Sequence, residues 1–364
     1  MSNDSPSVVA KAARDATRRV MVGSVAIGGG APVSVQSMCN TKTADAEATL
    51  AQIRQLAQAG CEIIRVTVPD KASLGPFGRI CAESPLPVVA DIHFDHRLAI
   101  GAARGGAAAM RINPGNIGSF DRVDEVIDAA GEEGCAIRIG VNAGSLDPAV
   151  GERTDLTLPE KLVASSVSFV EHFERRGFSD IVLSAKAHSV PVTLETYRAL
   201  SRELPDIPLH LGVTEAGTLR QGTVKNSVGV GILLAEGIGN TIRLSLTADP
   251  VEEVDVAWDL LSSLGMRRLH PELVSCPTCG RTQVDLIGLA EQVSSRLSRT
   301  NAPISVAVMG CVVNGPGEAR DADIGIACGK GQGLLFANGE PIRKVREDEM
   351  VDELFAEIER RFGV

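Results

Sequence analysis

One unit, repeated along the first two-thirds of the chain, limits the possible folds more than any other feature. Each copy is a short apolar strand, a polar loop and an amphipathic helix, and the copies follow one another at intervals of roughly 25–45 residues. Strands are predicted at residues 33–38, 62–68, 87–92, 107–112, 136–141, 180–185, 209–213 and 241–246. The helices between them include residues 46–59, 159–176 with Thr157 as the cap, 191–203 and 251–264.

Eight strands, each followed by a helix, over about 235 residues are the count and length of a (β/α)8 TIM barrel. The composition is 44% hydrophobic but only 3% aromatic, which suits the buried parallel strands of such an α/β fold. A doubly wound open sheet is the alternative, and the lack of a dinucleotide-binding glycine fingerprint weakens it. Ahead of the barrel, residues 18–33 alternate and then reach a glycine triplet, which predicts a small hairpin.

The chain is therefore expected to have three parts. Residues 1–17 are polar and lack the apolar segment of a signal peptide, so a disordered tail is predicted there. Residues 18–265 form the barrel, and residues 266–364 form a small α/β domain that opens with a connector at 266–275. In this domain strands are predicted at residues 304–308, 322–327, 334–337 and 342–345, and a helix at 347–362.

Charge and cysteine usage exclude several classes of protein. The net charge of −10 argues against general nucleic-acid binding. No run of about 18 apolar residues is present, so no membrane span is expected. Most of the eight cysteines lie in apolar segments, which favours a reducing cytoplasm over a disulfide framework.

Three cysteines in the small domain have the spacing of a metal or cluster site. Cys276 and Cys279 form a C-x-x-C pair, and Cys311 supplies a third thiolate if the chain folds back. Cys328 lies in an apolar run and is predicted to be core, so Glu318 is the nearest candidate for a fourth ligand. Zinc, a thioredoxin-like redox pair and an iron–sulfur cluster with one weakly held iron all remain open. The cluster fits the missing fourth thiolate best, and the redox pair is disfavoured because no strand-to-helix context is expected before Cys276.

Barrel enzymes place their chemistry at the C-terminal ends of the strands, and those ends are polar here. Guanidinium forks match phosphate oxygens two at a time. Burying five cations without an anion is costly, so the expected ligand carries two or more negative charges, as a diphosphate does. The predicted members of this pocket are the cations Arg65, Arg111, Arg138, Lys186 and Arg243 and the neutral donors Asn113, Asn142 and Ser245.

The carboxylates Asp91 and Glu215 are the candidates for proton transfer in this ring. Glu215 lies in a glycine-rich loop and is favoured as the proton donor, whereas pairing with an arginine is the alternative role for Asp91. Three histidines also lie at strand ends. His93 is grouped with the catalytic candidates and His210 with the substrate-binding residues, and a structural role is the alternative for these two and for His188.

The chain closely resembles the 4-hydroxy-3-methylbut-2-en-1-yl diphosphate synthase family of the methylerythritol phosphate route to isoprenoids. The resemblance extends from about residue 20 almost to the end of the chain, and it includes the cysteine segment and the barrel mouth. The motifs that carry it are PVSVQSM (32–38), RVTVP (65–69), ADIHF (90–94), RINPGN (111–116), RIGVNAGS (138–145), HLGVTEAG (210–217), CPTCG (276–280) and CVVNGPGE (311–318).

This resemblance implies a 4Fe–4S cluster bound by Cys276, Cys279, Cys311 and Glu318. It also implies the cyclic diphosphate substrate 2-C-methyl-D-erythritol 2,4-cyclodiphosphate, which suits the cationic pocket. The reaction would be a two-electron reductive ring opening and dehydration to (E)-4-hydroxy-3-methylbut-2-enyl diphosphate, fed by a flavodoxin or ferredoxin. Only residues 265–275 separate the barrel from the cluster domain, as in the short bacterial form of the family.

Within the same resemblance, four of the cations have a common role. Arg111, Arg138, Lys186 and Arg243 would hold the diphosphate, and Glu215 would protonate the leaving hydroxyl. Two rival functions stay open, which are a zinc-stabilised barrel that binds phosphorylated sugars without redox chemistry and a non-catalytic interaction protein. Converging cations disfavour the second rival.

The direction of the chain predicts a homodimer. The helix at residues 251–264 runs from the barrel mouth toward the opposite end, a distance of about 20 Å. The connector therefore starts far from the pocket that the cluster has to reach. A two-fold dimer in which each cluster domain caps the partner's barrel, so that active sites are shared between chains, solves this simply.

Overall fold

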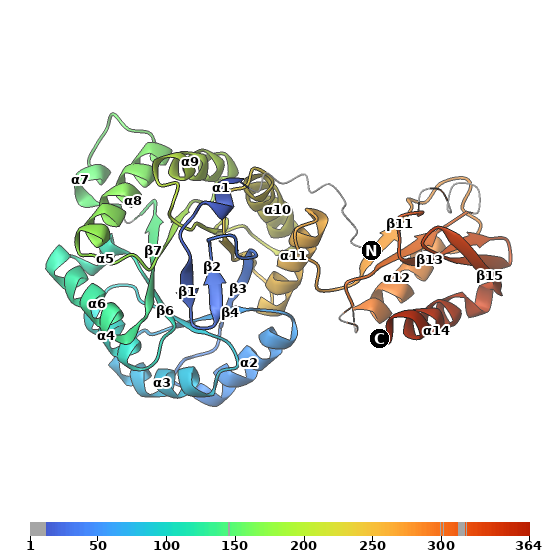
Figure 1. Ribbon diagram of the computed structural model, residues 1–364, viewed down its shortest axis with the longest axis horizontal. Helices are drawn as coiled ribbons and strands as arrows, with labels where there is room; N and C mark the ends of the chain where they lie inside the picture. The colour runs from blue at the N-terminus through green and yellow to red at the C-terminus, as the bar shows by residue number, and fades with distance from the viewer. Residues whose placement is uncertain (1–11, 145, 299, 301, 312–316, 318) are drawn as a thin grey trace. The chain divides into compact units, whose positions relative to one another are not determined.

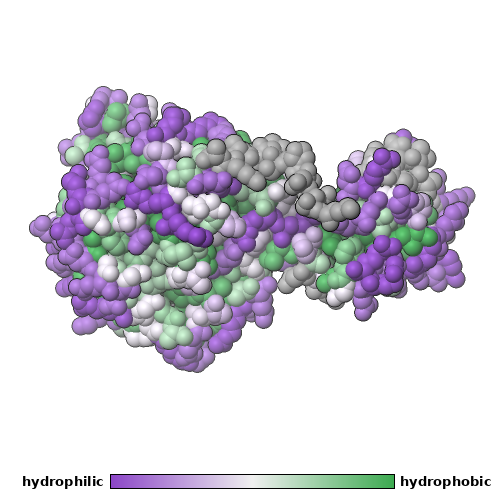
Figure 2. All heavy atoms as spheres, in the orientation of Figure 1, coloured by the Kyte–Doolittle hydropathy of each residue, from purple (hydrophilic) through white to green (hydrophobic). Residues whose placement is uncertain are grey.

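The computed structural model describes residues 12–144, 146–298, 300, 302–311, 317 and 319–364. It divides the chain into two compact units, Met1–Met266 and Arg267–Val364 (Figure 1), and each is considered by itself below. Hydrophilic and apolar residues are mixed on the visible surface of each unit (Figure 2). Within the described ranges, no helix is both long and apolar enough to cross a membrane.

Eight parallel strands form a ring in the first unit, which confirms the predicted TIM barrel. The strand order is β8-β7-β6-β5-β4-β3-β10-β9, and a parallel bridge between Leu183 and Leu209 joins the two ends of the sheet. The strands are β3 (Ser34–Met38), β4 (Ile63–Thr67), β5 (Val88–Asp91), β6 (Ala109–Ile112), β7 (Ala136–Asn142), β8 (Ile181–Lys186), β9 (His210–Leu211) and β10 (Thr241–Ile242).

Helices surround this ring and connect its successive strands (Figure 1). The predicted cap of α8 is confirmed, because the Thr157 hydroxyl accepts from the Glu160 amide in a capping box. Short helices form at α1 (Ala12–Asp15), α5 (Pro114–Ile117) and α7 (Pro148–Gly151), and a 3-10 turn forms at Lys71–Ser73. The longer helices are α2 (Ala46–Gln58), α3 (Leu74–Glu83), α4 (His96–Arg104), α6 (Phe120–Glu133), α8 (Leu158–Arg175), α9 (Val190–Glu203), α10 (Leu219–Ala235) and α11 (Pro250–Ser263).

The predicted hairpin is also present, as β1 (Val20–Val22) paired antiparallel with β2 (Val25–Ile27). It lies in the middle of the ring in Figure 1. Its apolar side chains share one core cluster with residues at the N-terminal ends of the barrel strands, among them Ile63, Val89 and Ala109. The hairpin therefore closes the floor of the barrel, which leaves the opposite end, where the strands finish, for ligands.

The predicted disordered tail is wrong for residues 12–17, whereas residues 1–11 lie outside the described part of the chain. Arg14 is buried, and its Nη2 donates to the carbonyl oxygen of Leu234 at 2.7 Å. Asn240 Nδ2 donates to the Arg14 carbonyl at 3.1 Å. These long-range hydrogen bonds attach the segment to the barrel, and no local sequence pattern predicts them.

The second unit is a five-stranded sheet with the order β11-β12-β13-β14-β15, in which β11, β12 and β13 are parallel and the last two pairs are antiparallel. All four predicted strands are found. The interpretation of 266–275 as a plain connector is wrong, because Glu272–Ser275 forms β11 against β12. The elements are β11, β12 (Ser305–Met309), β13 (Ile324–Gly329), β14 (Gln332–Ala337), β15 (Glu340–Arg346), α12 (Leu286–Leu297), the 3-10 turn Glu347–Glu349 and α14 (Met350–Phe362).

Two barrel strands, β9 and β10, end two or more residues earlier than the sequence pattern predicts. β10 stops at Ile242, although the apolar alternation continues to Leu246. The amide of Leu246 donates to Glu253 Oε1 on α11 at 2.9 Å, so a side chain has taken the place of a strand partner. β9 similarly ends at Leu211, just before the loop that carries Glu215.

Candidate active site

Strand register brings charged side chains together inside the barrel. Asp91 on β5 lies opposite Arg111 on β6, and Arg111 lies opposite Arg138 on β7. Residues paired in register point to the same face of a sheet, and two residues earlier on these strands are the apolar Val89 and Ala109 of the floor cluster. The barrel interior therefore changes from an apolar layer at the floor to a charged layer toward the mouth.

Asp91 is buried and faces three cationic or titratable groups. Its carboxylate lies 3.8 Å from Arg65 Nε, 3.7 Å from Arg111 Nη1 and 3.8 Å from His93 Nε2. Burial alone would raise the pKa of Asp91, but Arg65 and Arg111 outweigh it, with smaller help from His93, so the pKa is lowered. The structure thus shows the arginine pairing that was the alternative role for Asp91, and an ionised Asp91 positions two of the cations.

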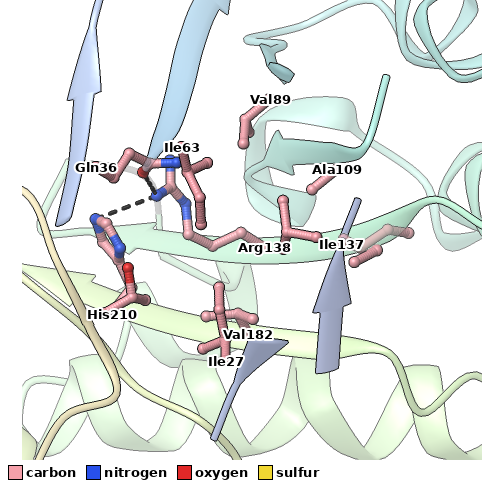
Figure 3. A pocket seen from close by; sticks show the side chains of 12 residues that line it. Ile27, Gln36, Ile63, Val89, Ala109, Ile137, Arg138, Val182 and His210 are labelled. Atoms are coloured by element: carbon pink, nitrogen blue, oxygen red, sulfur yellow. Dashed lines mark hydrogen bonds between the residues drawn. The ribbon is translucent and has the colours of Figure 1, made fainter. Parts of the chain in front are cut away.

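Arg138 lies at the centre of a buried polar trio (Figure 3). Its Nη1 donates to Gln36 Oε1 and lies 3.1 Å from His210 Nε2. Burial and then the nearby Arg138 and Lys186 lower the pKa of His210 well below its usual value, so the ring is neutral and Nε2 can accept from Arg138. The trio borders a small cavity whose other walls are mostly apolar, Ile27 and Val182 among them.

Two flanking contacts fix the backbone of this trio. Tyr197 on α9 is fully buried, and its hydroxyl donates to the His210 carbonyl at 2.6 Å and accepts from the Ala185 amide at 3.2 Å. Burial raises the pKa of Tyr197, so the hydroxyl remains a donor. A helix outside the ring therefore holds the strands that carry His210 and Lys186.

Lys186 completes the set of cations at the end of β8. Burial first, and then the charges of Arg65, Arg138, Arg243 and Arg111, lower the pKa of Lys186 well below its usual value. Gly212, which follows β9, lies beside the ammonium group of Lys186. A Cβ added at Gly212 would be 3.5 Å from Lys186 Nζ, and glycine leaves this space open. The five predicted cations therefore lie close enough for the charges of the four arginines to act on Lys186.

Glu253 on α11 is a site residue that the sequence reasoning missed. Arg243 Nη2 donates to Glu253 Oε1 at 3.1 Å, and Arg243 Nη1 donates to Ser245 Oγ at 2.6 Å. Glu253 is buried, which raises its pKa, although Arg243 acts in the opposite direction. An acidic residue on the core-facing side of the last barrel helix was the available signal, since Val254 and Ala257 beside it are core.

The two asparagines have local roles. Asn113 caps α5, because its Oδ1 accepts from the Gly115 amide at 3.0 Å. Asn142, with its amide oriented to satisfy both ends, accepts from Arg111 Nη2 at 3.0 Å and donates to the Val141 carbonyl at 3.1 Å. Asn142 therefore positions Arg111 from the neighbouring strand.

Glu215 is exposed and lies on the loop between β9 and α10. Its φ of +51° is in the left-handed region, which a residue other than glycine rarely adopts. Such conformations cost free energy and are concentrated at functional sites. His93 and His188 are exposed at the same end of the barrel.

The ends of two parallel strands in the second unit bring two of the three cysteines together. Ser275 of β11 pairs with Val308 of β12, so Cys276 and Cys311 follow adjacent strand ends. Cys276 Sγ accepts from the Gly310 amide at 3.2 Å, next to the buried Cys311. Cys328 is buried in the domain core as predicted, and burial raises its pKa to about 12.

Cys279 is exposed, and hydrogen bonds from Arg281 lower its pKa, which favours the thiolate that binds metals. Within the part of the chain that the structure describes, no three ligand-type side chains lie close enough to hold a metal ion. Glu318, the predicted fourth ligand, lies outside the described residues. Strand β11 leads directly into Cys276, but the next helix begins only at Leu286, so the C-x-x-C pair does not lie at a strand-to-helix turn like that of a thioredoxin-like pair.

Known proteins match this chain along nearly its whole length. A family model described as the GcpE TIM-barrel domain matches residues 17–258, and one described as the GcpE protein C-terminal domain matches residues 272–360. A Geobacter sulfurreducens protein named 4-hydroxy-3-methylbut-2-en-1-yl diphosphate synthase (flavodoxin) is 54% identical over 94% of this chain and 97% of its own length. A Clostridium acetobutylicum protein of the same name is 53% identical over 94% of this chain and 98% of its own length. The chain therefore belongs to the GcpE family.

Proposed function

We propose that this chain is a 4-hydroxy-3-methylbut-2-en-1-yl diphosphate synthase. It opens the ring of 2-C-methyl-D-erythritol 2,4-cyclodiphosphate by a two-electron reduction and releases water and (E)-4-hydroxy-3-methylbut-2-enyl diphosphate. Relatives that carry this name are 53–54% identical to this chain over nearly their whole length. The observation in the structure that supports it most is the convergence of five cations inside the barrel of a chain whose net charge is −10.

Buried donors in this pocket call for an anionic ligand. Arg138 Nε and Nη2 and Arg243 Nε are buried without a hydrogen-bond partner among the described residues. Leaving such groups unpaired is costly, and charged donors bind phosphate oxygens strongly. Arg111, Arg138, Lys186 and Arg243 would therefore hold the diphosphate, with Arg65, Asn142, His210 and Ser245 positioning them or the substrate. Asn113, which caps α5, is proposed as a further neutral donor to the substrate.

The second unit has residues that fit an iron–sulfur cluster. Cys276 and Cys311 follow adjacent strand ends, and Cys279 has a lowered pKa, so the donor set is of the thiolate type that clusters prefer. We assign Cys276, Cys279 and Cys311, with Glu318 as the fourth ligand, to a 4Fe–4S cluster. When bound, the cluster supplies the two electrons of the reduction, one at a time. The printed name of the relatives favours flavodoxin over ferredoxin as the electron donor.

Side chains of this chain bind the negative charge of the substrate and supply protons. Overall the substrate takes up two electrons and two protons, carbon–oxygen bonds break, and one oxygen leaves as water. Glu215, held in a strained backbone conformation at the mouth, donates the proton to the leaving hydroxyl. Asp91 stays ionised and holds Arg65 and Arg111 beside the bound diphosphate. His93 lies next to the Asp91 carboxylate on the side of the mouth.

The homodimer with shared active sites is part of the same proposal. The amide of Met266 donates to the Leu261 carbonyl, so the turn that ends α11 includes Met266. Because β11 begins at Glu272, residues 267–271 link the units. The six Cα–Cα steps from Met266 to Glu272 span at most about 22 Å, and α11 covers roughly 20 Å in the other direction, so the linker would have to run almost fully extended along the outside of the barrel to return. A cluster domain that serves the partner's barrel avoids this climb. We place the enzyme in the cytoplasm, where thiolates stay reduced.

Iron and acid-labile sulfide, measured in protein purified without air, test this function against the zinc-binding rival. A brown preparation with broad absorption near about 400 nm supports the cluster. Alanine at any of the three cysteines should abolish iron binding. Glu318→Ala should keep most of the iron but lose turnover, because a carboxylate adds little to cluster retention. A colourless wild-type protein that contains zinc would refute the proposal, and full activity of Glu318→Ala would remove Glu318 from the ligand set.

Subunit mixing tests the shared site. Cys311→Ala removes a cluster ligand and Glu215→Gln removes the proton donor, so each variant alone should be inactive. Exchange at equal concentrations makes about half of the dimers mixed, and each mixed dimer has one site with both parts intact. About a quarter of the wild-type sites should then regain activity. Exchange without any recovery would show that each cluster serves its own barrel.

A further inference from the structure

One seam of the barrel departs from regular strand pairing. Strand β8 is paired with β7 as far as Lys186, which lies opposite Asn142. On its other side, β8 meets β9 at a single bridge between Leu183 and Leu209 in the described part of the chain. The β8–β9 seam is therefore open toward the barrel mouth, and Lys186 lies at the edge of the opening.

A side-chain hydroxyl occupies this opening. In a parallel ladder, evenly spaced hydrogen bonds follow one another along the two strands. The Leu183 amide donates to the Pro208 carbonyl at 2.9 Å, so the next bond of the same kind would join the Ala185 amide to the His210 carbonyl. Instead, the Ala185 amide donates to the Tyr197 hydroxyl at 3.2 Å, and that hydroxyl donates to the His210 carbonyl at 2.6 Å. Tyr197 therefore replaces one bond of the ladder with two bonds in series.

This replacement widens the seam. When two hydrogen bonds of these lengths meet at a hydroxyl oxygen near the tetrahedral angle, their outer atoms lie about 4.7 Å apart, whereas a direct bond holds them about 2.9 Å apart. The two strands are therefore separated by about 2 Å more than in a regular ladder. The opening is local, since the Thr214 amide donates to the Ala187 carbonyl at 3.3 Å beyond it.

Both edges of the opening carry side chains of the cationic pocket. Lys186 is the last residue of β8, and its ammonium group reaches across the seam to Gly212, where an added Cβ would lie 3.5 Å from Nζ. On the other edge, the carbonyl of His210 accepts from Tyr197, and the ring Nε2 lies 3.1 Å from Arg138 Nη1 (Figure 3). The width of the seam therefore sets how far the Lys186 ammonium group lies from the Arg138 guanidinium.

We propose that Tyr197 is a positioning residue whose hydroxyl sets the width of the β8–β9 seam, and with it the separation of Lys186 and Arg138 that fits the diphosphate. Tyr197 is fully buried on α9, outside the ring of strands, so it acts through the strands and does not touch the ligand. A phenolic hydroxyl suits this position, because it accepts one bond and donates another from a rigid ring. The inference rests on the proposed function, which supplies the diphosphate as the ligand.

Removing the hydroxyl tests this role. Tyr197→Phe keeps the ring but lets the two strands pair directly, so the seam should narrow and the cations should move. The KM for the cyclic diphosphate should rise about tenfold or more, as should the Kd of inorganic diphosphate for the oxidised enzyme, measured by calorimetry. The kcat should stay within about threefold, because the diphosphate is held in the ground state and the transition state alike. A hydroxyl that only stabilised the fold would instead lower the amount of active enzyme at an unchanged KM.

Thr196→Val on the same helix is the matched control. It removes a buried hydroxyl that has no hydrogen-bond partner among the described residues. Its KM and its affinity for diphosphate should equal those of the wild type. A folded Tyr197→Phe enzyme with wild-type KM and affinity would overturn the inference, and so would an equal loss in Thr196→Val.

A label on the wild-type holoenzyme decides the question if Tyr197→Phe does not fold. Tyr197 is the only tyrosine of the chain, so 3-fluorotyrosine labels this position alone. The fluorine NMR signal should shift as inorganic diphosphate is added and should saturate with the Kd found by calorimetry. A signal that does not respond to bound diphosphate would overturn the inference alone, and turnover of the cyclic diphosphate would still support the function. A wild type that binds no diphosphate would overturn both the inference and the proposed substrate pocket.

Discussion

Replacing Gly140 with alanine tests whether the placement of one guanidinium limits catalysis. Gly140 lies in the middle of β7, where the strand passes Arg111. A Cβ at this position would lie 2.5 Å from Arg111 Nε and 3.1 Å from Arg111 Nη2. Ordinary contact begins at 3.4 Å, so the guanidinium has to move by about 0.9 Å, the difference between 3.4 and 2.5.

Such a shift disturbs the contacts that hold the Arg111 guanidinium in place. Its Nη2 has an acceptor in Asn142 at 3.0 Å, and its Nη1 lies 3.7 Å from Asp91. A misplacement of about 1 Å can cost about 10²-fold in rate when a group has to meet its substrate in a fixed geometry. The same overpacking should destabilise the barrel by about 1–3 kcal/mol. We expect Gly140→Ala to fold, to keep its iron and to lose about 10- to 100-fold in kcat/KM.

Steady-state turnover with a chemical reductant measures this loss, and binding of inorganic diphosphate to the oxidised enzyme measures the pocket directly. Gly131→Ala on α6 is the matched control, because a Cβ there would meet nothing within 4 Å. Alanine in that helix should be neutral or stabilising by up to about 1 kcal/mol. A folded Gly140→Ala enzyme with kcat/KM and diphosphate affinity like those of the wild type would refute the role given to Arg111.

Two further predictions concern buried carboxylates. Glu253→Gln removes the charge that faces Arg243, so it should lower kcat/KM about tenfold and the free energy of unfolding by about 1–3 kcal/mol, as measured by turnover and denaturant titration. The exposed Glu252→Gln on the same helix should change neither. Glu357 in the second unit has its pKa lowered to about 2 by hydrogen bonds from arginines, which outweigh burial. A lowered folded-state pKa stabilises the fold above the unfolded value of about 4.3, and this contribution is lost as the pH falls toward 2. Acid unfolding monitored by circular dichroism should therefore show a smaller pH dependence over that range in Glu357→Gln than in Glu359→Gln, an exposed control; equal slopes would contradict the assignment.

Local patterns in the sequence determined most of the fold. Alternating apolar strands and amphipathic helices depend on neighbours two to four residues apart, so the barrel, its hairpin and the Thr157 cap followed from the sequence alone. The polar strand ends were equally visible, because a TIM barrel has a known mouth. Spacing alone was also enough to propose the C-x-x-C pair and Cys311 as a ligand set.

Tertiary structure decided which groups position the site. Glu253 meets Arg243 because α11 folds back along the end of β10, and Gln36 meets Arg138 across the barrel, 102 residues apart. The need for glycine at position 140 comes from a guanidinium on the neighbouring strand. Strand β11 escaped prediction because four residues are too few to show a clear alternation, and their strand conformation depends on pairing with β12. Periodicity is a property of a short segment, whereas the partner of a charge depends on register between distant strands, and only the folded chain sets that register.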